Sequence, residues 1–181
     1  MQEAQSPRVP VLPESDWDEK TRALLDQVGR HNIFAVLANH PDLLQQWMQF
    51  TGHILVGSSL PARERELVIL RTGWLCRSEY EFGQHRVLGR HAGLTEHDIV
   101  WITEAEVGSG WSERDRILLL VTDQLVTEHQ LSDTLWKALS TGWSLHQVMD
   151  IVFTVGQYVL VSTALNTFQV PLDEGLEGFS A

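Results

Sequence analysis

Three side chains in one short part of the chain have the chemistry of a proton-transfer site. Glu81 and His85 are four residues apart, so on a helix they lie on the same face. Glu66 precedes them on an apolar segment and reaches them only if a turn folds the two segments together. Histidine titrates near neutral pH, and a carboxylate can orient its ring and support its cation. The pattern predicts His85 as a general acid/base, assisted by Glu66 and Glu81.

Each of these residues also has a purely structural interpretation. His85 is then a core histidine paired with a carboxylate. Glu81 is the partner of Ser78 in a capping box, Ser78-Glu79-Tyr80-Glu81, at a helix start. Glu66 follows Arg63 by three positions, which suits a surface ion pair.

Other residues of the same segment are candidates for binding a substrate. Arg71 could clamp a substrate carboxylate, with a structural salt bridge as its alternative. Tyr80 and Trp74 could line a pocket, with core packing as the alternative. Cys76, the single cysteine, is interpreted as a small buried side chain.

A metal site is a second possible use of the same three residues. Glu66, Glu81 and His85 offer two carboxylates and an imidazole to a divalent ion. The seven other histidines, including His31, form no metal-binding spacing and are interpreted as structural or exposed. The leading interpretation therefore includes neither a metal nor another cofactor.

The elements that must position these residues are predicted to be helices. Pro41, Pro61, Ser78, Thr95, Ser112 and Ser144 stand before apolar segments of helical period, and no alternating strand pattern interrupts them. Helices are expected to start near Trp17, Pro41, Pro61, Ser78, Thr95, Ser112, Ser132 and Ser144. We therefore predict an all-α bundle over residues 17–170, with an N-terminal arm, 1–16, and a C-terminal tail, 171–181.

Composition narrows the class of protein further. The 181 residues carry a net charge of −11, which argues against binding to nucleic acid or to an anionic membrane. The single cysteine allows no internal disulfide, and residues 1–13 do not resemble a signal peptide, so the cytoplasm is the expected location. The apolar stretch from Val148 to Leu165 contains Asp150 and Gln157, which favours a buried or interface helix over a membrane span.

The segment 61–99 resembles the core of the carboxymuconolactone decarboxylase and alkylhydroperoxidase D-like superfamily. In the redox branch of that superfamily, a Glu is followed by a Cys twelve positions on, a second Cys three later and a His four later. Here these positions hold Glu66, Ser78, Glu81 and His85. The Ala-Gly-Leu-Thr sequence after His91 and the closing apolar helix also resemble the superfamily, and the resemblance covers most of residues 35–170.

The resemblance implies a helical fold, a homo-oligomer (trimer or hexamer) and a small-molecule substrate. Its thiol peroxidase chemistry needs an attacking thiolate and a resolving thiol, and Ser78 and Glu81 supply neither. Peroxidase-type activity is therefore disfavoured. We expect a lyase or isomerase that transfers protons on a small carboxylated or cyclic metabolite, without a cofactor. A metal-binding protein and a non-catalytic oligomeric binding protein remain as alternatives.

Overall fold

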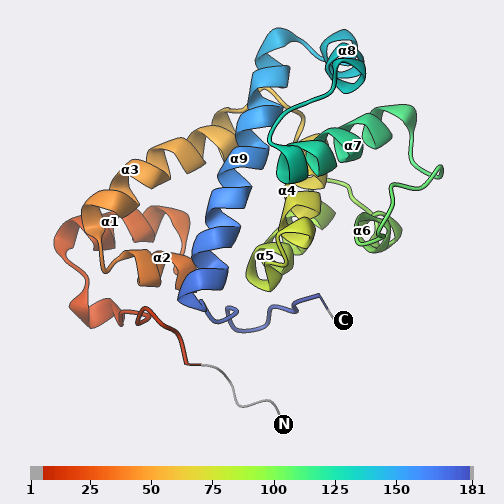
Figure 1. Cartoon of the computed structure of the whole chain (residues 1–181). Helices are drawn as coiled ribbons and strands as arrows, with labels where there is room; N and C mark the ends of the chain where they lie inside the picture. Colours follow the sequence, from red (N-terminus) through yellow and green to blue (C-terminus); the bar gives the residue numbers. More distant parts are fainter. Residues whose placement is uncertain (1–5, 180–181) are drawn as a thin grey trace.

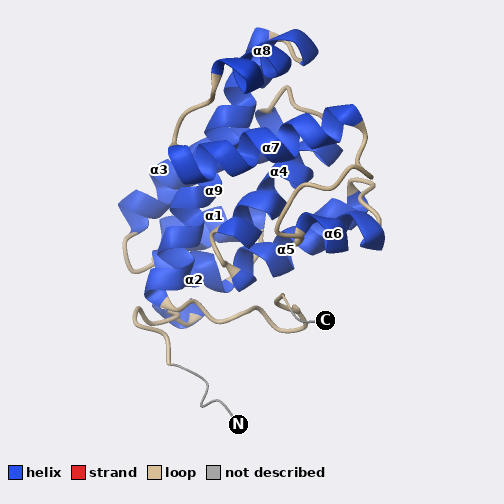
Figure 2. Cartoon of the chain, turned by 45° about the vertical axis from the view of Figure 1, so that its right-hand side comes forward, coloured by secondary structure: helices blue, strands red, loops and turns tan. Residues whose placement is uncertain are grey.

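The protein folds into a bundle of helices. The computed structural model describes residues 6–179, and all regular secondary structure in that range is helical, which confirms the predicted fold class (Figure 2). The helices are α1 (Glu19–Val28), α2 (Asn32–Leu37), α3 (Pro41–Gly52), α4 (Ala62–Leu75), α5 (Glu79–His91), α6 (Glu96–Ile102), α7 (Glu113–Glu128), α8 (Asp133–Gly142) and α9 (Leu145–Phe168). A π-helical turn, His53–Gly57, continues α3.

Most helix starts lie where the sequence predicts them. Thr95 with Asp98, and Ser144 with Gln147, form reciprocal capping boxes at the starts of α6 and α9. The capping box predicted at Ser78 is wrong, because the Ser78 hydroxyl is buried and makes no hydrogen bond within the described residues. Helix α2 was not predicted, since six residues are too few to show a helical period.

Helix α4 lies at the centre of the bundle. It packs against α5, α7 and α9, and its segment from Glu66 to Gly73 is buried on every side. In Figure 1 the long helix α9 runs beside α4, with α1 to α3 on one side and α5 to α7 on the other. The central position of α4 explains why its polar side chains need internal partners.

Helix α9 is apolar around its whole circumference, as the sequence predicts. It is long and apolar enough to span a membrane by composition, but half of its most apolar window is buried inside the bundle. Its contacts with α4, α5, α7 and α8 are those of a core helix. One stripe of apolar side chains on α9 nevertheless remains exposed.

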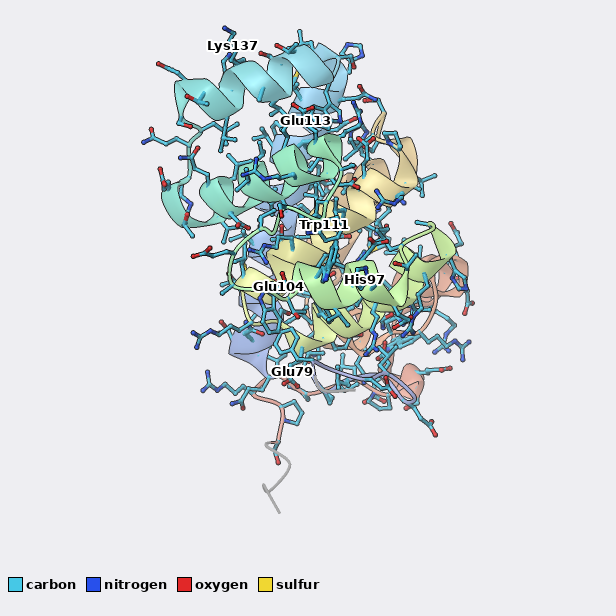
Figure 3. The ribbon with its side chains drawn as sticks, turned by 90° about the vertical axis from the view of Figure 1, so that its right-hand side faces the viewer. Glu79, His97, Glu104, Trp111, Glu113 and Lys137 are labelled. Atoms are coloured by element: carbon cyan, nitrogen blue, oxygen red, sulfur yellow. The ribbon has the colours of Figure 1, made fainter. Side chains whose placement is uncertain are left out.

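Arg71 binds α4 to two neighbouring helices. Its Nε and Nη2 donate to the Asp123 carboxylate of α7 at 2.6 and 2.9 Å. Its Nη1 donates to the carbonyl oxygens of Ile102 and Glu104, at the end of α6, at 2.6 and 2.7 Å. Figure 3 shows Glu104 and Trp111 on the connection between α6 and α7, which covers this side of the bundle. The salt-bridge alternative for Arg71 is therefore the arrangement found.

Both described chain ends pack against the bundle. The Arg8 backbone N–H donates to the Phe168 carbonyl at 2.8 Å, and that of Leu12 donates to the Ala35 carbonyl at 3.2 Å. Near the other end, Phe179 packs on Trp74 with ring centroids 5.0 Å apart. Residues 1–5 of the predicted arm and 180–181 of the tail lie outside the described residues.

We predict that Arg71→Met lowers the free energy of unfolding by about 2–4 kcal/mol, because it leaves the buried Ile102 carbonyl, the half-buried Glu104 carbonyl and Asp123 without their donor. Chemical denaturation measures the change. The matched control is Arg116→Met on the exposed face of α7, which we expect to change stability by less than about 0.5 kcal/mol. Equal stability of Arg71→Met and wild type would contradict the role assigned to Arg71.

Candidate active site

The structure brings Glu66, His85 and Glu81 together into one buried chain of hydrogen bonds. His85 Nδ1 lies 2.6 Å from Glu66 Oε2, and His85 Nε2 lies 3.0 Å from Glu81 Oε1. Each of the three residues is at most 5% exposed. The predicted catalytic group therefore exists as a unit, with the imidazole between two carboxylates.

A tight turn between α4 and α5 makes this arrangement possible. Arg77 adopts a left-handed backbone conformation with φ of 53°, and the Ser78 N–H donates to the Gly73 carbonyl at 2.9 Å. The chain then reverses, so that α5 packs along α4. This reversal places Glu66, near the start of α4, beside His85 on α5.

The carboxylate of Glu81 is committed to His85 instead of to a helix cap. Glu81 precedes His85 by one helical turn on the buried face of α5. The backbone N–H of Ser78 already donates to the Gly73 carbonyl, and the imidazole offers the carboxylate a charged donor instead. The same competition explains why the predicted capping box does not form.

Arg65 completes the electrostatic balance of the group. Its Nε and Nη2 lie 3.3 and 3.2 Å from Glu66 Oε1, so both oxygens of that carboxylate have cationic partners. Arg63, the partner considered from sequence, instead binds Asp115 at 2.7 Å. Two carboxylates thus face one guanidinium and one imidazole, which offsets the cost of burying each charge.

These contacts fix the charge state of His85. Burial alone lowers the pKa of His85, but the adjacent carboxylates of Glu66 and Glu81 outweigh it and raise the pKa to about 10. Burial raises the pKa of Glu66, and His85 with Arg65 outweighs that effect and lowers it. At neutral pH the imidazole is therefore a cation with a proton on each nitrogen, and Glu66 is ionised.

Tyr158 of α9 packs perpendicular to the imidazole, with ring centroids 4.9 Å apart and an interplanar angle of 83°. Burial, together with the charges of Glu81 and Glu66, raises the pKa of Tyr158 well above its usual value. Its phenol is therefore neutral, and its ring separates the ion pair from water on that side.

The imidazole and Glu81 form part of the wall of a pocket of about 330 Å³. This volume is at the small end of the range for ligand sites, roughly 300–1,000 Å³. The lining residues are Val28, His31, Ile33, Phe34, Trp47, Met48, Thr51, Gly52, Leu55, Val56, Tyr80, Glu81, Gln84, His85, Leu88, Gln157, Tyr158 and Val161. They include no arginine and no lysine, so the pocket suits a small and largely apolar molecule.

The three residues predicted to bind substrate do not lie together in the structure. Tyr80 lines the pocket. Arg71 does not, because Asp123 and two carbonyls hold its guanidinium on the other side of α4. Trp74 lies outside the pocket wall as well and packs against Phe82 and Phe179.

Cys76 ends α4, away from the pocket wall. Its thiol is free and half-buried, and burial raises its pKa, which lowers the thiolate fraction on which reactivity depends. A thiol in this position has neither the activation nor the second thiol that a two-cysteine peroxidase site needs.

His31 and Gln84 are two of the pocket residues that were missed from the sequence. His31, just before α2, and Gln84 on α5 both line the pocket and contact Asp173 of the C-terminal tail. Gln84 follows Tyr80 by one helical turn, a spacing that identifies it once Tyr80 is placed on the pocket face. The sequence carries no local signal for His31, because its partner lies far away along the chain.

The site does not present the metal-ligand geometry considered from sequence. Among residues 6–179, no three His, Cys, Asp or Glu side chains are grouped so as to hold a metal ion. Both nitrogens of His85 face carboxylate oxygens, so the ring offers no lone pair to a cation.

Comparison with known proteins agrees with this fold. Residues 41–123 match the carboxymuconolactone decarboxylase family. The fold is similar to that of an uncharacterised peroxidase-related protein with an alkylhydroperoxidase AhpD core from Ralstonia eutropha JMP134, with a TM-score of 0.83 and 18% identity over 93% of each chain. It is equally similar to an uncharacterised peroxidase-related protein from Silicibacter sp. TM1040, with a TM-score of 0.83 and 13% identity over 96% of each chain.

A third similar structure is a cysteine-to-alanine variant of the debrominase Bmp8 in complex with 2,3,4-tribromopyrrole. Its TM-score is 0.78, with 12% identity over 95% of each chain. No curated protein matches the sequence. The match to the family over residues 41–123 supports membership of the carboxymuconolactone decarboxylase and AhpD-like superfamily, and the three similar structures, at 12–18% identity, show that the fold is shared.

The raised pKa of His85 predicts a pH-dependent contribution to stability. In the unfolded chain a histidine titrates near about 6.5. The stabilisation by His85 is therefore fully present below about pH 6.5 and is lost as the pH rises towards the folded pKa of about 10. We expect His85→Gln to cost about 3 kcal/mol or more near pH 6, and progressively less towards pH 10.

Denaturation at several pH values measures this difference. The exposed His146→Gln serves as the control and should change stability by less than about 0.5 kcal/mol throughout. A cost of His85→Gln that grows with pH would show that the folded-state pKa is lowered instead.

Proposed function

We propose that this protein is a proton-transfer enzyme of the decarboxylase or isomerase type, acting on a small cyclic metabolite. The observation that carries the proposal is that His85 and Glu81 of the Glu66–His85–Glu81 group lie in the wall of a pocket, with Glu66 behind the imidazole. A buried imidazolium in contact with a ligand-sized cavity is a positioned acid.

The proposed step uses the proton between His85 Nε2 and Glu81. Loss of carbon dioxide, or removal of a proton by the Glu81 carboxylate in the pocket wall, leaves a carbanion or enolate on the substrate, whose electron pair takes the Nε2 proton. The imidazole becomes neutral, and solvent protonates it again through Glu81. Glu66 and Arg65 hold the ring in place and support its cationic form.

The pocket lining favours an uncharged ring over a carboxylated substrate, and so favours the isomerase type over the decarboxylase type. The absence of arginine and lysine from the wall leaves His85 as its only cation, and that cation already faces two carboxylates. The ring ligand of Bmp8, 2,3,4-tribromopyrrole, belongs to the size and polarity class that this pocket suits. The cytoplasm remains the proposed location.

Two other functions are weighed against this one. The full hydrogen bonding of His85 favours a non-catalytic binding protein. The names of two similar structures favour a peroxidase. The single, half-buried Cys76 outside the pocket argues against thiol-dependent peroxide reduction.

We predict that the protein catalyses deuterium exchange at the carbon next to the carbonyl of some five- or six-membered lactones or cyclic ketones in D2O. Mass spectrometry of a panel of these compounds measures the exchange. His85→Gln and Glu81→Gln should slow it by about 10²–10⁴-fold, and Glu66→Gln by less, because Glu66→Gln leaves the acid in place.

Glu79→Gln is the matched control, since Glu79 lies on the exposed face of α5 (Figure 3). Unchanged exchange in His85→Gln, together with a lowered stability, would support the binding protein instead.

We also propose that the chain forms a homo-oligomer, a trimer or hexamer by family resemblance. The exposed stripe on α9 supports self-association: Leu145, Met149, Phe153 and Leu160 follow a helical spacing and are 52–69% exposed. Phe50 of α3 extends the stripe, with its ring 6.1 Å from that of Phe153.

We therefore expect light scattering to give a multiple of the 20.5 kDa protomer mass. Phe153→Glu should dissociate the assembly because it places a charge in the stripe, and Val100→Glu on exposed α6 should not. A wild-type mass near 20.5 kDa at micromolar concentration would refute this proposal.

A further inference from the structure

A second histidine–carboxylate pair lies in the same pocket. His31 Nδ1 is 2.8 Å from Asp173 Oδ2, and His31 lines the pocket wall. We propose that His31, held by Asp173, is a hydrogen-bond and proton acceptor for an O–H or N–H group on a small uncharged ring.

The C-terminal tail fixes the carboxylate of this pair. Asp173 Oδ1 accepts from the Asn32 backbone N–H at 2.7 Å. Asp173 Oδ2 accepts from the Tyr80 hydroxyl at 2.8 Å and from the Gln84 side-chain amide. Asp173 is therefore bound from two elements at once and positions His31 as part of a rigid network.

The tail can lie this close to α5 because residue 83 is a glycine. A Cβ atom on Gly83 would be 2.6 Å from the Glu177 carbonyl oxygen, closer than real contacts allow. The backbone of the tail thus rests directly on α5, one residue away from Gln84. This contact seats Asp173 next to the pocket wall.

The hydrogen bonds determine which nitrogen of His31 is free. His31 Nδ1 faces Asp173 Oδ2 at 2.8 Å and the Gln84 amide nitrogen at 3.2 Å. The Gln84 amide already donates to Asp173 Oδ2, and a carboxylate oxygen only accepts, so Nδ1 carries the proton and donates it to the nearer Asp173. Within residues 6–179, no hydrogen-bond partner of Nε2 is found, and the side chain is 43% exposed. With its proton on Nδ1, the ring offers a lone pair on Nε2. His85 differs, because carboxylates occupy both of its nitrogens.

A glycine also leaves room for this nitrogen. Gly29 has a φ of 99°, which favours glycine, and a Cβ atom there would lie 3.2 Å from His31 Nε2. The edge of the ring therefore stays open where a side chain would cover it.

The remaining pocket wall defines the kind of ligand. Most of it is apolar, and the polar pair Thr51 and Gln157 is bound to itself, with Gln157 Nε2 donating to Thr51 Oγ1 at 3.0 Å. A free acceptor in an apolar pocket selects a ring that carries one donor. If the proton transfers, the O–H bond of the ligand breaks, the electron pair stays on oxygen, and Nε2–H forms on an imidazole whose Nδ1–H is held by Asp173.

The test compares two rings that differ only in the donor. Wild type should bind 4-chlorophenol about tenfold more tightly than 4-chlorotoluene at pH 7.5, measured by NMR titration. His31→Phe keeps a ring against Phe34 but removes the acceptor, so the preference should fall to about one. His53→Phe is the control: it removes a His–Asp pair of the same kind, with Asp150, outside the pocket wall.

A second measurement needs no variant. In wild type, a two-bond 1H–15N correlation spectrum should show His31 with its proton on Nδ1, and the Nε2 signal should move on addition of 4-chlorophenol only. A proton on Nε2, equal affinities for the two rings, a preference retained in His31→Phe, or no binding of either ring at millimolar concentration would overturn the proposal. Neither readout depends on deuterium exchange, so this proposal and the proposed function fail independently.

Discussion

The buried ion pair between Glu66 and His85 is the interaction on which the rest of the site depends. It joins α4 to α5 at a separation of 2.6 Å, with neither residue more than 5% exposed. Removing one partner would leave an uncompensated charge in the core. That charge would weaken both the packing of α5 on α4 and the arrangement of the site. Arg65 and Glu81 extend the pair into a group with two positive and two negative charges. The same contacts that make the group stable also keep the imidazole protonated.

The fold could be predicted because its signals are local. Caps such as Thr95 with Asp98, prolines at helix starts and helical apolar periods act within a few residues of each other, and the structure follows them. Helix α2 was missed because it is too short to show a period. Glu66, Glu81 and His85 were found because family spacing and helical spacing agree. Glu81 pairs with His85 and does not cap α5. This choice depends on how α4 and α5 fold together, which local sequence patterns do not encode.

The pocket could not be predicted, because its walls come from distant parts of the chain. His31, Gln84 and Asp173 meet only after the C-terminal tail crosses α5. Arg71 illustrates the converse case. Its position on a buried helix suggested that it binds a substrate carboxylate. Its guanidinium instead donates to Asp123 and to two backbone carbonyls, so its role is structural. A pocket with acidic and basic groups but no free cation fits chemistry on uncharged rings.

The charge state of His85 tests this account most directly. A two-bond 1H–15N correlation spectrum of the protein at pH 8, assigned by comparison with His85→Gln, reports the protons on each imidazole. We expect His85 to carry a proton on both nitrogens at this pH, since its pKa is raised to about 10 while a free histidine would be neutral. A neutral His85 with a single ring proton would contradict both the ion pair with Glu66 and the acid proposed for the reaction.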